Sequence, residues 1–382
     1  MRPSTEDILD SLAECATTDF ANGRTLPPPI YHDQGILDLE IDRLFCKEWI
    51  CLGRQAEIPA TGDFLCRDIV DSPVFVVRQR DQSIKAFANV CAHRSARLLE
   101  SDGHVKRISC PYHSWTYEID GRLIGAPFMK ETPGFNVRSH RLKELPCTTW
   151  EGFIYVSLDP NAAPVDEGLS ALSEQVRDFR MADYVPVFSR EDTWNTNWKC
   201  LVENYMDAYH VHRVHRDSFG KYGTSEAQTT LVDGEDAFTY HYVQEEDGPK
   251  AVQAHAANSW LKGANRNRVY LINIFPGHTM QLQPDMLWYL SVLPDGVDKV
   301  NIRWAVSIPA EILADAKNTT AHINEIMSLL HQVNSEDRPI IENVFRTTRS
   351  PNALQGPLCY LERNVWQFGR YLARKLCSQE RS

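Results

Sequence analysis

Two short stretches of the chain place cysteines and histidines at the spacing of metal ligands. One residue separates Cys91 from His93, and two residues separate Cys110 from His113. Two thiolates and two imidazoles form the ligand set of a mixed-ligand [2Fe–2S] cluster, in which two Cys hold one iron and two His hold the other. Neutral imidazoles make such a cluster less negative than four thiolates do, and this raises its reduction potential. The pattern therefore predicts a one-electron carrier of moderate potential.

A structural zinc site is the alternative for the same four residues, since Cys₂His₂ is a common zinc ligand set. The usual zinc spacing pairs two cysteines first and two histidines later. Here each stretch carries one Cys and one His. This alternating order favours the cluster over zinc.

The segment around these ligands resembles the Rieske domain of the Rieske non-haem iron oxygenases. All four ligand positions match the C-x-H and C-x-x-H motifs of that family. The family usually has Gly where Ser95 stands, and Gly or Ala where Ser114 stands. Both differences keep a small side chain, so we expect them to be compatible with the cluster.

A second set of potential ligands lies about a hundred residues further along the chain, where His210, His212 and His215 occur together. Five residues turn a straight α-helix through about 500°, which leaves the rings of His210 and His215 roughly 140° apart. These two residues can reach one metal only if the helix ends, kinks or widens between them. His212 and His215 are three residues apart and would share a helix face without distortion. Spacing alone favours that second pair.

The same stretch is similar to the catalytic motif of the Rieske oxygenases, N-W-K followed by E-N-x-x-D-x-Y-H-x-x-x-x-H. The resemblance implies that His210 and His215 hold a mononuclear iron and that His212 is not a ligand. In the family, the Asp of this motif links a cluster histidine of one subunit to an iron histidine of the next. The resemblance therefore implies that Asp207 bridges His113 of a neighbouring copy to His210. The matching residues are Asn197, Trp198, Lys199, Glu203, Asn204, Asp207, Tyr209, His210 and His215.

A third ligand is needed from elsewhere in the chain. Two histidines and one carboxylate form a facial triad, which leaves positions on Fe(II) open for O₂. Asp337 shares a helix face with the apolar residues before it, although it could instead cap a new helix whose first turn holds Pro339. Its surroundings resemble the late E-D-x-x-x-x-E segment of the family, in which the Asp is the ligand. Asp337 is thus the expected ligand, with Glu336 and Glu342 as alternates.

Length and composition limit the remaining possibilities. The chain has 382 residues, of which 43% are hydrophobic and 24% are charged, and this is ordinary for a globular protein of two or more domains. A formal net charge of -11 provides no basic footprint for nucleic acid or anionic lipid. No apolar run approaches the length of a membrane span, and no secretory signal is visible. Because the 10 Cys are scattered, we expect reduced thiols and a cytoplasmic protein.

The pattern of apolar residues predicts an α+β protein with three parts. Residues 1–45 are expected to form a helical segment that packs on the catalytic domain. Residues 46–157 contain short β-branched and aromatic runs between turns, which predict a small all-β Rieske domain. Residues 158–382 begin with a linker and a helix and continue from Trp194 with strand-rich segments and two amphipathic helices. This part is predicted to be the catalytic mononuclear iron domain, an antiparallel sheet covered by helices.

The resemblance implies the oxygenase component of a multicomponent mono- or dioxygenase that uses O₂. The sequence has no G-x-G-x-x-G after a strand and no plant-type Cys run. Electrons from NAD(P)H would therefore arrive through a separate reductase, directly or through a ferredoxin. The family forms α₃ rings, or α₃β₃ rings with a small β subunit, and its shorter α chains are more often α₃, so the resemblance favours a homotrimer. In another functional class, the chain would be a Rieske electron-transfer protein without oxygenase activity.

The substrate of such an enzyme is a small organic molecule. Carnitine-oxidising members of the family carry Glu where Asp207 stands, which favours hydroxylation or demethylation of an aromatic compound. The alternative is a quaternary ammonium compound similar to choline, betaine or carnitine, held in an aromatic cage of Trp260, Trp288 and Tyr240. The candidates for pocket residues are Phe238, Tyr240, Tyr270, Ile272, Ile274, Met280 and Trp288.

Overall fold

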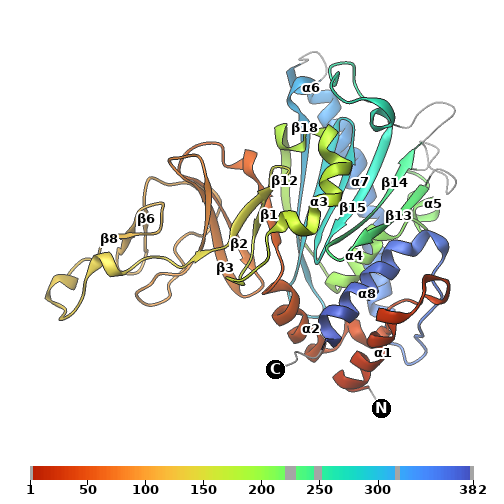
Figure 1. Cartoon of the computed structure of the whole chain (residues 1–382), viewed down its shortest axis with the longest axis horizontal. Helices are drawn as coiled ribbons and strands as arrows, with labels where there is room; N and C mark the ends of the chain where they lie inside the picture. Colours follow the sequence, from red (N-terminus) through yellow and green to blue (C-terminus); the bar gives the residue numbers. More distant parts are fainter. Residues whose placement is uncertain (1–2, 220–228, 245–251, 315–318, 379–382) are drawn as a thin grey trace. The chain divides into compact units, whose positions relative to one another are not determined.

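A computed structural model describes residues 3–219, 229–244, 252–314 and 319–378 (Figure 1). The chain divides into two compact units. We name residues 45–165 the cluster unit, and residues 1–44 and 166–382 together the catalytic unit.

The cluster unit is built from short antiparallel strands. A five-stranded sheet has the order β5-β2-β3-β4-β9, and two three-stranded sheets have the orders β1-β11-β10 and β6-β7-β8. Its hydrophobic core includes the thiols of Cys91 and Cys110 beside Phe75, Phe87 and Tyr117. The strands are β1 (Ile50–Arg54), β2 (Asp63–Ile69), β3 (Ser72–Arg78), β4 (Ile84–Ala88), β5 (Gly103–His104), β6 (Ile108–Ser109), β7 (Thr116–Tyr117), β8 (Leu123–Gly125), β9 (Glu144–Leu145), β10 (Cys147–Trp150) and β11 (Phe153–Val156).

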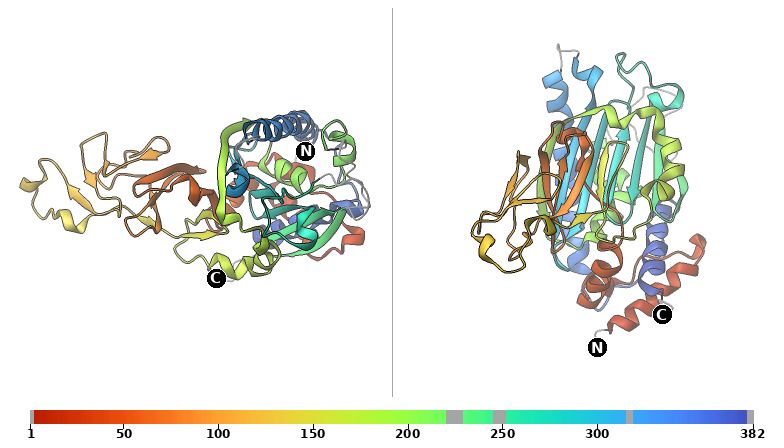
Figure 2. Two further views of the ribbon diagram at one scale, coloured as in Figure 1. Left: turned by 90° about the horizontal axis from the view of Figure 1, so that it is seen from above. Right: turned by 60° about the vertical axis from the view of Figure 1, so that its left-hand side comes forward.

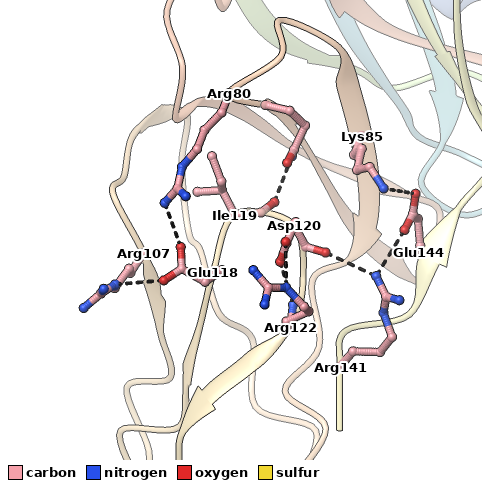
Figure 3. A network of polar contacts seen from close by, with 10 residues as sticks. Arg80, Lys85, Arg107, Glu118, Ile119, Asp120, Arg122, Arg141 and Glu144 are labelled. Atoms are coloured by element: carbon pink, nitrogen blue, oxygen red, sulfur yellow. Dashed lines mark hydrogen bonds and ion pairs between the residues drawn. The ribbon is translucent and has the colours of Figure 1, made fainter. Parts of the chain in front are cut away.

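A polar network ties the β7–β8 hairpin to the five-stranded sheet (Figure 3). Glu118, in the turn of this hairpin, pairs with Arg80 at 3.0 Å and with Arg107 at 3.2 Å. Behind these exposed pairs, the buried amide of Gln79 donates to the carbonyl of Ile119 at 2.8 Å. Because the hairpin follows directly from the second ligand loop, these bonds stabilise the position of that loop on the sheet.

The catalytic unit is organised around one seven-stranded antiparallel sheet with the order β12-β18-β17-β16-β15-β14-β13. The edge strand β12 spans Tyr184–Trp194, ahead of the strand-rich segments that the sequence predicts after Trp194. Many of its residues are exposed or partly exposed, and it contains Pro186, which is tolerated on an edge strand. The other strands are β13 (Thr229–Glu235), β14 (Phe238–Gln244), β15 (Arg268–Ile274), β16 (His278–Gln283), β17 (Met286–Pro294) and β18 (Val300–Pro309).

Helices lie on both faces of this sheet, with α3 and α7 on opposite sides (Figure 2). The helix α4 packs on β15, β17, α7 and α8. The first and last helices, α1 and α8, lie side by side (Figure 1). No helix among the described residues has both the length and the apolar character needed to cross a membrane. The helices are α1 (Thr5–Thr17), α2 (Gln34–Glu40), α3 (Val165–Val176), α4 (Trp198–Met206), α5 (Val211–Val214), α6 (Ala310–Ala314), α7 (Thr319–Thr347) and α8 (Arg363–Cys377).

The α7 helix continues through Pro339 without a new start. The alternative in which Asp337 caps a second helix is therefore wrong. Proline removes one backbone hydrogen bond inside a helix, but the ends of this long helix extend two turns or more beyond the interruption on both sides. Asp337 consequently lies within a continuous helix.

A buried ion pair joins the N-terminal segment to α4. Lys199 Nζ lies 2.7 Å from Glu40 Oε1, and Trp198 Nε1 donates to Glu40 Oε2 at 2.7 Å. The side chains of Lys199 and Glu40 are 1% and 0% exposed. One turn further along α4, the hydroxyl of Tyr31 donates to the buried carboxyl group of Glu203 at 2.7 Å. Residues of the N-W-K motif and the N-terminal segment thus hold α4 in place.

Breaking the buried pair should destabilise the catalytic unit strongly. We expect Lys199→Met to lower the free energy of unfolding by about 3–5 kcal/mol, because Glu40 is left charged and unpaired. The double variant Lys199→Met with Glu40→Leu should recover most of this loss. Denaturant unfolding measures the free energy of unfolding of the single and the double variant. Disruption of the exposed pair Lys85–Glu144 is the control. A single variant as stable as the parent would contradict the prediction.

Glu203 should make stability depend on pH. Burial raises the pKa of its carboxyl group from 4.5 to about 7, although Tyr31 and Lys199 act in the other direction. The folded protein then holds a proton that the unfolded chain has lost, so stability falls as pH rises from 4.5 to about 7, by up to about 3 kcal/mol. Unfolding at several pH values should show a smaller fall for Glu203→Gln. Equal pH dependence in both proteins would refute this.

Candidate functional site

The two ligand loops of the cluster unit share one backbone geometry. The amide of Cys91 donates to Ala96 and that of Ser95 donates back to Cys91, at 2.8 and 3.1 Å. The second loop repeats both bonds: Cys110 to Trp115 at 2.8 Å, and Ser114 to Cys110 at 3.0 Å. The two serines have φ values of 56° and 58°, in the left-handed region where glycine costs least. This geometry explains the preference for Gly at these positions.

The four sequence-predicted cluster residues lie on these loops with both thiols buried, His93 exposed and His113 partly buried. Cys91 and Cys110 are 2% and 3% exposed. The ring centroids of His93 and His113 are 4.7 Å apart. Nδ1 of His113 is buried and has no hydrogen-bond partner among the described residues. A buried thiol pair, adjacent imidazoles and an unpartnered ring nitrogen fit a mixed-ligand [2Fe–2S] cluster.

Aromatic side chains surround these loops. Trp115 stacks on the ring of His93, with centroids 4.8 Å apart and planes 7° from parallel. The hydroxyl of Tyr117 lies 3.3 Å from Cys91 Sγ and accepts from the amide of Ala92 at 3.1 Å. These contacts fix the first loop and keep water from its thiol.

In the catalytic unit, the helix containing the second motif is broken before its two motif histidines. The α4 helix ends at Met206, and the four-residue α5 begins at Val211. Between them Asp207 has extended backbone, with φ -80° and ψ 110°, and does not share a helix face with His210. The condition that spacing imposed on His210 and His215 is met by the short length of α5, which ends at Val214, so His215 at its C-terminus (φ -97°, ψ 24°) is no longer helical.

Three ligand atoms converge at this break. His210 Nε2 and His215 Nε2 are 3.3 Å apart, and Asp337 Oδ1 lies 3.6 Å from the first and 3.1 Å from the second. Ligand atoms about 2 Å from a metal, at right angles, lie about 3 Å from one another. His215 and Asp337 are 2% and 9% exposed. This donor set fits a facial triad on Fe(II).

Without a metal, the triad attracts protons. Burial acts to lower the pKa of His210, but Asp207 and Asp337 outweigh it and raise that pKa to about 9. Burial likewise acts to raise the pKa of Asp337, whereas His210 and His215 lower it to about 2. The triad is buried, and its two imidazoles and carboxylate lie close together. Positive charge shared among them, either as protons or as a metal ion, stabilises this arrangement.

The alternative ligands lie elsewhere around the triad. His212 is exposed, and its Nδ1 lies 2.6 Å from the carbonyl of Tyr209. Glu342 accepts from Arg338 and from the amide of Asn195. Glu336 contacts the far ring nitrogen of His215, not the face shared with Asp337.

A cavity of about 370 Å³ opens beside the triad. Its floor is the sheet, where cross-strand pairing aligns His241, Leu271, Gln281 and Trp288 in one row. Its other walls come from α4, α5 and α7, which contribute apolar side chains together with polar ones such as His322 and Glu325. Tyr205 lies opposite Trp288, with ring centroids 5.7 Å apart. Additional lining residues are Phe219, Val243, Val269, Met286, Ile326 and Leu330.

Most of the expected pocket residues face away from this cavity. Trp288 lines it, but successive residues of a strand point to opposite faces, and the other six residues belong to the opposite face. There Tyr240 packs on Tyr270, which contacts Phe179 after α3. The expected cage of Trp260, Trp288 and Tyr240 is therefore wrong.

Two protein-family profiles match the chain. The profile of the Rieske [2Fe-2S] domain matches residues 48–144. The profile described as ring hydroxylating alpha subunit (catalytic domain) matches residues 150–378, which is more than half of the chain.

Relatives of known activity share part of this sequence. The glycine betaine monooxygenase oxygenase subunit of Pseudomonas aeruginosa is 36% identical over 219 residues, covering 56% of this chain and 51% of the relative. The carnitine monooxygenase oxygenase subunit of Escherichia coli is 32% identical over 194 residues, covering 50% and 52%. The chain thus spans about half the length of the curated relatives it matches.

Solved structures share the fold along nearly the whole chain. A quaternary ammonium Rieske monooxygenase superposes with a TM-score of 0.83, covering 96% of this chain and 98% of the other, at 20% identity. Naphthalene 1,2-dioxygenase from Rhodococcus superposes with a TM-score of 0.81, covering 99% of both chains, also at 20% identity. At this identity the superpositions establish the fold alone. Together with the family profiles they show that the chain belongs to the alpha subunits of the Rieske non-haem iron oxygenases, with a Rieske [2Fe–2S] domain followed by a non-haem iron catalytic domain.

Proposed function

We propose that this chain is the oxygenase component of a multicomponent monooxygenase that oxidises a quaternary ammonium compound. Electrons from NAD(P)H would reach it through a separate reductase, directly or by way of a ferredoxin. The observation that carries the proposal is the convergence of His210, His215 and Asp337 within 4.8 Å at the wall of a largely apolar cavity.

The residues present fit both metal groups of the family. Cys91, Cys110, His93 and His113 would hold the cluster in the cluster unit. The triad would hold Fe(II) in the catalytic unit. When bound, the cluster supplies single electrons and the iron supplies open positions for O₂. The apolar walls of the cavity would exclude water and keep the substrate close to the iron.

Asp207 is the proposed link between the two metal sites. Its Oδ2 lies 3.2 Å from His210 Nδ1, outside the angle of a formed hydrogen bond, and its Oδ1 accepts from the amide of Tyr209 at 2.6 Å. We infer that this carboxylate orients His210 and meets His113 of a neighbouring copy in a homotrimer. Asp207 would then hold the proton on Nδ1 of His210 when electrons pass between copies.

Cavity chemistry and relatives together favour a cationic substrate. Tyr205, Trp288 and Phe219 line the cavity, and the faces of such aromatic rings attract quaternary ammonium groups. Neither Lys nor Arg occurs among the described lining residues. Burial lowers the pKa of His241 to about 4, so the floor adds no positive charge at neutral pH.

This proposal replaces the preference for aromatic substrates that Asp207 suggested. Relatives above 30% identity include the oxygenase subunits for glycine betaine and carnitine. A biphenyl dioxygenase subunit is 34% identical over 201 residues, so an arene is the second candidate. The many aliphatic side chains of the cavity would accept an arene as well.

Replacement of a triad residue should remove one kind of iron only. We expect His210→Ala to lose the mononuclear iron, falling from about three irons per chain to about two, and to lose turnover. The reduced-state electron paramagnetic resonance signal of the cluster should persist. His212→Ala, an exposed histidine two residues away, is the control for iron content. Full iron content in His210→Ala would overturn the ligand assignment.

Asp207→Asn should separate metal binding from electron transfer. Both metal sites should remain loaded, because neither loses a ligand, whereas coupled product formation should fall to background. Rapid mixing of the reduced protein with O₂ and substrate measures whether the cluster is reoxidised in a single turnover. Parent-like coupled turnover of the variant would show that electrons take another route.

A charged substrate and its uncharged isostere should be distinguished by Trp288. Choline and 3,3-dimethylbutan-1-ol have similar shapes, but only choline carries a positive charge. We expect hydroxylated or demethylated product from trimethylammonium compounds. The kcat/KM of the neutral analogue should be lower than that of choline by a factor of about ten or more, since cation–π contacts contribute about 1–2 kcal/mol. Trp288→Leu should reduce that ratio, whereas Trp260→Leu, outside the cavity, should not. Product from indole or biphenyl alone would favour the arene candidate.

A further inference from the structure

The ring of His215 is held from both of its nitrogens by consecutive residues of α7. On one side, Nε2 lies 3.1 Å from Asp337 Oδ1. On the other side, Nδ1 lies 2.9 Å from Glu336 Oε2. Consecutive residues of a helix point about 100° apart, so one helix can present carboxylates to two edges of the same ring. Glu336 is thus more than an unused alternate for the iron ligand.

Glu336 is itself fixed by two donors. The buried hydroxyl of Ser218 donates to Glu336 Oε2 at 2.6 Å. The side-chain amide of Gln332, one turn earlier on α7, donates through Nε2 to Glu336 Oε1 at 2.9 Å. Ser218 lies three residues after His215, and both are almost fully buried. Both oxygens of the carboxylate therefore have partners that hold it against the ring.

We propose that Glu336 is a positioning residue that holds a proton on Nδ1 of His215 and so leaves the lone pair of Nε2 aimed at the iron. A histidine ligand is oriented, and its tautomer selected, by the group that its other nitrogen contacts. A carboxylate acceptor also makes the imidazole a stronger ligand. The inference rests on the proposed function, in which His210, His215 and Asp337 hold the iron.

The two histidines of the triad differ in the carboxylate behind them. The carboxylate behind His210 belongs to Asp207, in the break between α4 and α5, and is not aligned for a hydrogen bond. The carboxylate behind His215 belongs to a continuous helix and accepts three hydrogen bonds within the catalytic unit. Glu336 accordingly serves iron retention, whereas Asp207 serves the link to a neighbouring copy.

Iron retention can be measured without turnover. The purified protein is mixed anaerobically with an Fe(II) chelator, and the release of mononuclear iron is followed while the cluster absorbance reports the cluster. Iron-free protein is then titrated with Co(II) to obtain an affinity. We expect Glu336→Gln to bind either metal 10–100-fold more weakly, the usual cost of losing such a partner. Ser218→Ala should cause a smaller loss in the same direction.

Control variants make the result specific. Glu311→Gln, an exposed carboxylate on the neighbouring α6, should bind metal like the parent. The melting temperature and cluster content of Glu336→Gln should also equal those of the parent. Parent-like metal affinity in Glu336→Gln would overturn the inference, and so would a fall in affinity no larger than the accompanying loss of folded protein. His215→Ala separates the two proposals: retained mononuclear iron there contradicts the ligand assignment itself.

Discussion

The geometry of the triad depends on the short helix α5, which follows the interruption at Asp207 and ends at Val214, between His210 and His215. Two histidines five residues apart cannot face one metal from a straight helix. The carboxylate of Asp207 accepts from the amide of Tyr209, two residues on, and this local turn competes with continuation of α4. The new helix α5 ends after four residues, before His215, and His210 Nε2 and His215 Nε2 can therefore approach to 3.3 Å. The residue proposed to carry electrons is therefore also the residue that shapes the iron site.

The α7 helix forms the other wall of the site and is continuous, whereas the α4–α5 segment is interrupted. The α7 helix has 29 residues and supplies Glu336 and Asp337 together with apolar residues of the cavity. A rigid helix can position two carboxylates around one imidazole more exactly than a loop could. Since α4 packs on both α7 and the sheet, the buried pair of Lys199 and Glu40 helps to hold the two walls at a fixed distance.

Helix caps and buried strands can be predicted from the sequence, because each depends on residues close together in the chain. The capping box of Ser4 and Asp7 and the cap of Asp33 each involve residues three positions apart, so spacing along the chain is enough to indicate them. The strands β15, β17 and β18 were identifiable from apolar runs. Strand β12 gives no such signal, because this edge strand exposes polar residues and lacks a continuous apolar run.

Features that depend on distant residues could not be predicted. Strand β15 is apolar on both faces, so its alternation does not show which face lines the cavity, and the expectation that Tyr270 lines it is wrong. Glu40 pairs with Lys199 across 159 residues, and no local signal connects them. The sequence presents Glu336 only as an alternate ligand, because its contact with His215 joins residues 121 positions apart.

The central claim is that two different iron sites occupy one chain. A crystal structure of the aerobically purified protein, with anomalous scattering measured on both sides of the iron absorption edge, tests this most directly. The account predicts a pair of iron peaks between Cys91, His93, Cys110 and His113, and a single peak among His210, His215 and Asp337. An iron-loaded protein without a peak at the triad, or with a single zinc peak between the cysteines, would contradict it.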